Sequence, residues 1–472
     1  MILCIYILLG LLISWLELRR RFSGQALDAM TAFNCYYFVL FVFVPINVIF
    51  LGASVVRQRY AYEEFGPGDI STALCLFFSY VLFCLGYWLK SSKNSKVNVR
   101  GGGDHFLLRD STRVAKIIFC VGVLLTIVYV IQIGGILEAI SKAGDVRSGE
   151  FVVESKYIGY RHLAQFSADA FVLLAAVMLG KKEKKIELTT RDWVFLLSAF
   201  LFFVYYALST AGRRPFINPI ILCYLVYSSL GGRLKKATAI AFVLVFLVAG
   251  LGSMLGSFVP LDDGAALADV ARATDGNLQA VSIVAYENAT QGLADSYIHF
   301  VGAQKASLWQ FGFLSDIANL PRDFFPSQLL GFQRTGDMYD GVSEYFLGHP
   351  LVEGLSGQET LGIHGYFLVN FGYVGMFALF FVLGLFYKWI HIRFKPAPKD
   401  AVGWLVYWWV VLGFFVYFRE GVLVLMLKAQ LTWWLTIALL LYYRGKRQPS
   451  APGLRVTSGH VHGLSDAQSQ QT

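Results

Sequence analysis

The chain has 472 residues, of which 56% are hydrophobic and only 15% are charged. A soluble domain carries about a quarter charged residues and a lower apolar fraction, so this composition argues against a large soluble protein. The net charge of +9 does not indicate nucleic-acid binding, because the basic residues stand in short clusters between apolar runs and form no stripe interleaved with aromatic residues.

The apolar residues recur in runs of roughly 17–25, the length that crosses about 30 Å of hydrocarbon. These runs predict an all-α polytopic membrane protein with about eleven transmembrane helices. We place the helices at residues 2–17, 31–52, 70–90, 116–134, 163–180, 193–209, 215–231, 237–257, 365–389, 402–418 and 421–443. The first run has no basic residues before it and Arg19–Arg21 after it, which indicates a retained helix whose N-terminus lies outside rather than a cleaved signal peptide.

The distribution of basic residues predicts the orientation of the chain. When the helices alternate from an outer N-terminus, every segment placed in the cytoplasm is basic, as at Arg19–Arg21, Lys181–Lys185 and Lys388–Lys399. Lysine and arginine accumulate in the cytoplasmic loops of membrane proteins. The pattern therefore predicts an N-terminus outside and a C-terminus inside.

This topology divides the chain into four regions. Residues 1–257 form an eight-helix membrane region, 258–364 a large outer loop that is partly helical, 365–447 a three-helix membrane region, and 448–472 a polar cytoplasmic tail that we expect to be disordered. A loop as long as the outer one is usually functional. The sequence has no internal repeat, which weakens the case for an inverted-repeat transporter.

Two arginines stand in a very short outer turn, against the usual topology signal. Arg213 and Arg214 precede Pro215, which suits the first turn of a helix that runs inward. The positive end of that helix dipole faces outward, so the pair predicts a site for a phosphate or pyrophosphate. The alternative is a pair of snorkelling arginines that contact loop carboxylates or lipid headgroups.

The large loop and the start of the ninth predicted helix carry further candidates. Arg322 and Arg334 could bind sugar hydroxyls or pyrophosphate, or could belong to a solvated loop face. His364 stands at the outer mouth of the helix, five residues after Glu359. A histidine there is a candidate general base or phosphate donor, although a structural role is the alternative.

Ionisable residues also occur at or inside the helices. Arg419 stands at the outer end of a predicted helix, and Lys428 follows about two turns deeper. Asp169 has a similar depth in the fifth helix. Such residues are costly in a membrane and are functional candidates. Asp169 and Lys428 could form an ion pair, with either a structural or a functional role. All these groups lie near the outer leaflet in the predicted topology.

Several of these segments resemble one family of membrane enzymes. His364–Phe367 followed by Phe371–Gly375 is similar to a pattern of histidine, apolar residues and Gly-x-x-Gly in O-antigen ligases and polymerases, although Gly365 stands where that family often has Asn or Ser. Thr210–Arg214 resembles the Gly-Arg segment that precedes a helix in this family, and Pro321-Arg322 with Pro326 resembles its Pro-Arg segment. Arg419 is similar to an arginine near its last helix. Over most of its length the chain resembles the Wzy-type O-antigen and oligosaccharide repeat-unit polymerases.

The resemblance implies a GT-C-like fold and a metal-independent glycosyltransferase without a cofactor, placed in the bacterial inner membrane with a periplasmic active site. It implies undecaprenyl-pyrophosphate-linked oligosaccharides as both donor and acceptor, in contact with membrane lipid, and leaves open a chain-length regulator as a partner. His364 or Glu359 would activate the acceptor hydroxyl. The residues that would bind pyrophosphate or substrate are Arg213, Arg214, Arg322, Arg334 and Arg419. The alternatives are an O-antigen ligase, which transfers glycan to lipid A core, and a transporter or flippase of lipid-linked glycans.

Overall fold

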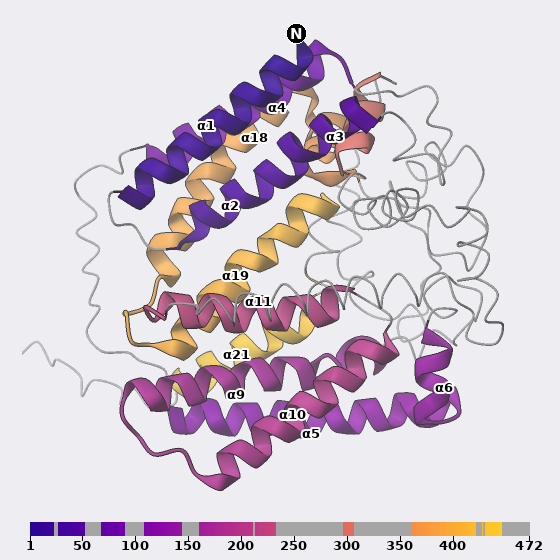
Figure 1. Ribbon diagram of the computed structural model, residues 1–472, viewed down its shortest axis with the longest axis vertical. Coiled ribbons are helices and arrows are strands. Elements are labelled where there is room, and N and C mark those ends of the chain that lie inside the picture. Colours follow the sequence, from indigo (N-terminus) through magenta and orange to yellow (C-terminus); the bar gives the residue numbers. More distant parts are fainter. Residues whose placement is uncertain are drawn as a thin grey trace, which may run out of the picture.

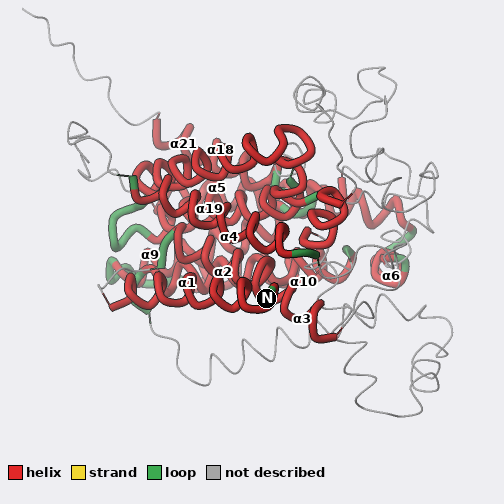
Figure 2. The backbone as a smooth tube through the Cα atoms, turned by 90° about the horizontal axis from the view of Figure 1, so that it is seen from above, coloured by secondary structure: helices red, strands yellow, loops and turns green. Residues whose placement is uncertain are grey.

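The computed structural model describes residues 1–22, 27–51, 68–89, 108–143, 160–210, 213–232, 296–305, 361–421, 427 and 430–445. Every regular element in these residues is a helix (Figures 1 and 2). The elements are α1 (Ile2–Phe22), α2 (Ala29–Phe38), the π-helix η1 (Val39–Phe43), α3 (Val44–Leu51), α4 (Ile70–Trp88), α5 (Leu108–Ile133), α6 (Ile136–Ser141), α9 (Phe166–Glu183), α10 (Thr190–Ser209), α11 (Arg213–Ser229), α18 (Gly362–Phe394), α19 (Ala401–Glu420) and α21 (Leu431–Gly445). A further helix covers residues 296–305.

Within these ranges, eight helices are long and apolar enough to cross a membrane. Their outward faces are apolar as well, since Leu124 is 62% exposed, Ile131 69% and Val374 84%. Water would not favour so much exposed apolar surface on one soluble chain, whereas lipid tails match it. The prediction of an all-helical fold is confirmed for the described residues, and their long apolar helices are compatible with a polytopic membrane protein. The exact number of crossings and the orientation remain predictions.

The predicted helices fall on described helices, except that 237–257 lies outside the described residues. Within the described part, α11 and α21 span 17 and 15 residues and are shorter than the other predicted crossings. The helix expected from residue 116 instead begins at Leu108. Its polar first turns are stabilised by Asp110 near the positive end of the helix dipole. The 448–472 tail and most of the 258–364 loop lie outside the described ranges.

The helices form three groups that pack on one another (Figure 1). α4 packs against α18 and α1, and α2 packs against the same two helices, while α5, α9 and α10 form a group at the opposite side. Between them lie α11 and α19, which contact each other and α9, and α21, which contacts α5 and α9. The first and last thirds of the sequence therefore share one bundle, which places residues far apart in the chain beside one another.

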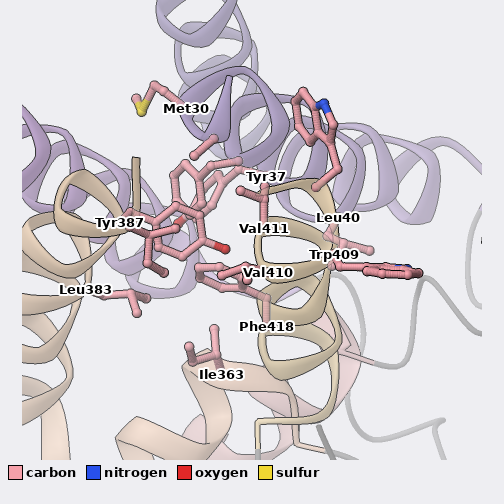
Figure 3. Packing of buried hydrophobic residues seen from close by; sticks show 14 of the residues in the cluster. Met30, Tyr37, Leu40, Ile363, Leu383, Tyr387, Trp409, Val410, Val411 and Phe418 are labelled. Carbon is pink, nitrogen blue, oxygen red and sulfur yellow. The ribbon is translucent and has the colours of Figure 1, made fainter. Parts of the chain in front are cut away.

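α4 and α18 pack closely against each other, and glycine permits the contact. A Cβ atom at Gly86 would overlap the carbonyl oxygen of Phe381, and one at Gly384 would overlap that of Phe83. Association in lipid depends on close backbone packing rather than on a hydrophobic driving force. Beside this contact Phe33 stacks on Phe83 with ring centroids 3.5 Å apart. Figure 3 shows more of the same buried cluster, including residues of α2, α18 and α19.

Candidate functional site

Residues 296–305, part of the predicted outer loop, fold onto the ends of three long helices. The Ser296 hydroxyl donates to the carbonyl oxygen of Arg419 at 3.1 Å. The hydroxyls of Tyr297 and Tyr6 lie 3.0 Å apart, and the Thr72 hydroxyl donates to the Gln304 side-chain oxygen at 2.5 Å. The start of α1, the start of α4 and the end of α19 therefore lie on one side of the bundle. The predicted topology places all three ends outside.

The start of α18 meets the end of α19 at two glycines on this side. Gly362 and Gly421 have φ values of +62° and +79°, which favour glycine. A Cβ atom at Gly421 would lie 2.6 Å from the Gly362 carbonyl oxygen, and one at Gly362 would lie 2.9 Å from the Ser296 Cβ. The backbones are thus in direct contact. The segments that carry His364 and Arg419 are neighbours in space although 55 residues separate Arg419 from His364 in the sequence.

His364 lies at the centre of an aromatic cluster and has no exposed surface. The rings of Phe41 and Phe380 each lie 4.3 Å from the imidazole, centroid to centroid. Phe300 of the loop helix lies 5.5 Å away. The described part of the outer loop therefore helps to cover this side chain.

The hydrogen bonds of Tyr37 indicate which tautomer His364 adopts. The Tyr37 hydroxyl donates its one proton to the Leu76 carbonyl oxygen at 2.7 Å. Its oxygen lies 3.0 Å from His364 Nε2 and must accept a proton there. We therefore assign the neutral ring proton to Nε2, which leaves the lone pair on Nδ1. Nδ1 has no hydrogen-bond partner among the described residues.

A π-helix places Phe41 against His364. η1 widens the backbone over Val39–Phe43, where the Val44 N–H donates to the Val39 carbonyl five residues earlier. Pro45 follows, and proline has no N–H and clashes with the carbonyl four residues before it, here that of Phe41. π-Helical turns often occur at functional sites. The sequence signal was Pro45 inside an apolar run, which helix periodicity alone does not interpret.

The segment of the predicted anion site forms the start of α11, which begins at Arg213, two residues before Pro215, and anion binding there stays a prediction. The backbone of Arg213 and Arg214 forms the first turn of the helix. Their side chains lie outside what the structure describes. Thr210 stands three residues before Arg213, at the negative end of α10. Its carbonyl oxygen accepts a hydrogen bond from the Arg161 guanidinium at 2.7 Å. Arg161 was missed as a candidate, although it too is an arginine on a predicted outer segment.

The remaining candidates have different outcomes. Arg419 is half-buried at the end of α19. Glu359, Arg322, Arg334 and Lys428 lie outside the described residues, so the roles predicted for them and the Asp169–Lys428 pair stay predictions.

Asp169 is 2% exposed and lines a cavity of about 30 Å³. The other lining residues are Gln165, Ala168, Val172, Pro215, Asn218, Pro219, Leu222, Gln430 and Trp433. Asp169 was identified from its depth in an apolar run. The amides that share the cavity with it carried no such signal, because an uncharged residue near a helix end is common.

Among the described residues, no group of three or more His, Cys, Asp or Glu side chains could hold a metal ion. Comparison of the whole chain with protein-family models, with curated proteins and with solved structures gave no match.

Proposed function

We propose that this chain is a polysaccharide polymerase of the inner membrane that joins undecaprenyl-pyrophosphate-linked oligosaccharide repeat units at the periplasmic face. The observation that best supports the proposal is the meeting of His364, Arg419 and loop residues 296–305 at one side of the bundle. In the predicted topology this side faces the periplasm, where lipid-linked units would be presented.

The proposed reaction transfers a growing glycan from its pyrophosphate carrier to the hydroxyl of a new repeat unit. Cationic groups are needed to stabilise the departing pyrophosphate, and arginine binds phosphate oxygens with two parallel hydrogen bonds. Arg213, Arg214 and Arg419 are placed at helix ends and suit this role in the proposal. Arg322 and Arg334 would assist from the loop, and His364 or Glu359 would accept the proton from the attacking hydroxyl.

Burial limits what His364 can do in this conformation. Its bare Nδ1 has the lone pair that a base requires, but the side chain is fully enclosed. For His364 to contact substrate, the covering segment with Phe300 would have to move from the helix ends. In the proposal, this movement accompanies substrate binding.

The test is a chromosomal deletion complemented with variants, followed by electrophoresis of the extracted surface glycan. Deletion should reduce a ladder of chain lengths to a single repeat unit. Wild type should restore the ladder, whereas Arg214→Ala and His364→Ala should not. Arg393→Ala is the matched control, because Arg393 is exposed at the opposite end of α18 and should restore full length.

Immunoblots of the membrane fraction establish that each variant is present in equal amount. Full polymer length in both the Arg214→Ala and the His364→Ala cells would contradict the assigned site. Loss of all O-antigen from the lipid A core on deletion would instead identify a ligase. A ladder that survives deletion would contradict the enzyme assignment and favour transport.

A further inference from the structure

The cavity beside Asp169 is formed where the chain interrupts its helices. Gln165 precedes α9, Gln430 precedes α21, and Pro215 and Pro219 belong to the first turns of α11. Pro219 has no N–H, so the Pro215 carbonyl four residues earlier lacks its helical donor. Irregular backbone at membrane depth is tolerated where it lines a cavity, and in membrane proteins such places are frequently binding sites.

The cavity contains a buried polar side chain whose hydrogen bonds are unmade. Gln430 is 3% exposed, and neither its Nε2 nor its Oε1 has a hydrogen-bond partner in the part of the chain that the structure describes. Burial of an unpaired amide is costly, so such a group indicates an absent partner. Gln430 presents both a donor and an acceptor, and Asn218 adds a second amide to the same lining.

Asp169 is enclosed in the cavity wall, and its Oδ2 has no hydrogen-bond partner among the described residues. The side chains of Gln165 and Trp433 line the cavity beside it. α11 and α21 begin beside the cavity, and a helix start carries about half a positive charge. Tyr206 of α10 is the titratable neighbour, and Asp169 makes no ion pair among the described residues.

The size and chemistry of the cavity select its occupant. A water molecule requires a cavity of at least about 10–15 Å³, so this cavity of about 30 Å³ holds a hydroxyl group or a water molecule but not a sugar ring. A hydroxyl can donate to Asp169 and accept from an amide N–H at the same time. A metal cation would use the oxygens only and would face two positive helix ends.

We propose that this cavity binds the acceptor sugar hydroxyl and that Asp169 accepts its proton, which revises the assignment of that role to His364 or Glu359 in the proposed function. The inference rests on the proposed polymerase function. The hydroxyl O–H bond breaks and the proton moves to the Asp169 carboxylate, while the oxygen forms a bond to the anomeric carbon of the donor. The bond from that carbon to the pyrophosphate oxygen breaks, and its electron pair leaves with the pyrophosphate. Arg213 and Arg214 begin the helix whose Pro215 lines the cavity, which would place the leaving group nearby.

The test measures polymerisation by the full-length protein in inner-membrane vesicles supplied with a synthetic undecaprenyl-pyrophosphate-linked repeat unit. We expect Asp169→Asn to reduce kcat by about 100-fold or more, with KM nearly unchanged. Asp169→Glu should retain part of the activity with a shifted pH profile, and Gln430→Met should raise the KM for the acceptor. Asp192→Asn is the matched control, because Asp192 pairs with Lys181 at 2.7 Å at the start of α10, away from the cavity.

The outcomes separate this inference from the function on which it rests. If wild type makes no polymer, the polymerase proposal fails, and the role of Asp169 fails with it. If wild type is active and Asp169→Asn stays within about twofold of it, only the role of Asp169 is overturned. An Asp169→Glu variant with an unshifted pH profile would show a structural role and would also overturn it. A melting temperature that rises in Na⁺ over choline, and no longer does so in Asp169→Asn, would assign the cavity to a cation instead.

Discussion

At the scale of single residues, the structure distinguishes side chains that the sequence presents as equals. Arg20 and Arg21 both belong to the basic cluster that predicts the cytoplasmic end of α1. Arg20 is 8% exposed and pairs with Asp28 at 2.5 Å and with Glu17 at 3.0 Å. Arg21 keeps a 39% exposed side chain and, among the described residues, pairs with Glu17 alone. One arginine therefore joins two helices, while the other faces the surroundings.

We expect Arg20→Ala to lower the free energy of unfolding by about 3–5 kcal/mol, because it leaves Asp28 and Glu17 partly buried without their shared cation. Arg21→Ala should cost at most about 1 kcal/mol, as exposed pairs do. Unfolding in mixed detergent micelles titrated with dodecyl sulfate measures both. Equal losses for the two variants would show that the buried network does not stabilise the fold.

A second prediction concerns the ring orientation of His364. Tyr37→Phe removes the acceptor for Nε2–H and leaves a buried N–H unpaired, at a cost of about 1–3 kcal/mol. We expect a lower melting temperature and, if polymerisation needs His364 in this orientation, shorter glycan. Tyr80→Phe is the control, because Tyr80 is equally buried but donates to Asn34. If Tyr37→Phe makes full-length glycan, polymerisation does not depend on this orientation of the His364 ring.

At the scale of elements, capping explains where α4 begins. The Asp69 carboxylate accepts from the Thr72 backbone N–H, and the Thr72 hydroxyl oxygen accepts from the Asp69 backbone N–H, which forms a capping box. Hydrogen bonds from the Ser71 hydroxyl and from Thr72 hold the pKa of Asp69 below its usual value. The stability that the carboxylate contributes is therefore present above about pH 4 and is lost as the pH falls through the folded pKa.

Asp69→Asn keeps a capping side chain but cannot titrate. We expect wild type to lose more of its melting temperature than this variant between pH 5 and pH 3, since only wild type loses the charged cap. The effect is small, because Asp69 is exposed. Parallel curves for the two proteins over this range would contradict the assignment.

Apolar runs located most elements, but details inside them required backbone chemistry. The length of 70–90 and of 193–209 predicted α4 and α10 closely, because hydrophobic thickness sets those lengths. The run at 365–389 belongs to a helix of 33 residues with non-helical backbone at Gly372 (φ +64°, ψ −174°). Hydropathy does not report such a break. Hydropathy also does not predict the π-helix before Pro45, because the whole segment is apolar.

At the scale of the whole molecule, the candidate site depends on contacts between distant parts of the sequence. His364 and Arg419 were found from their positions near helix ends. The enclosure of His364 by Tyr37, Phe41 and Phe300 could not be found in this way, because no local pattern reports which helices are neighbours. Gln430 is recognised as a candidate only from the structure, which places it beside Asp169 in the cavity. Sequence reasoning thus identified charged candidates, and tertiary packing identified their uncharged partners.

The most direct test of the account is reconstitution of the purified protein in liposomes with an undecaprenyl-pyrophosphate-linked repeat unit as the sole substrate. Mass spectrometry should detect carrier-linked glycans in whole multiples of the repeat unit, with one undecaprenyl pyrophosphate released for each new bond. Products that never exceed a single repeat unit, from protein that shows a cooperative melting transition, would contradict the polymerase proposal.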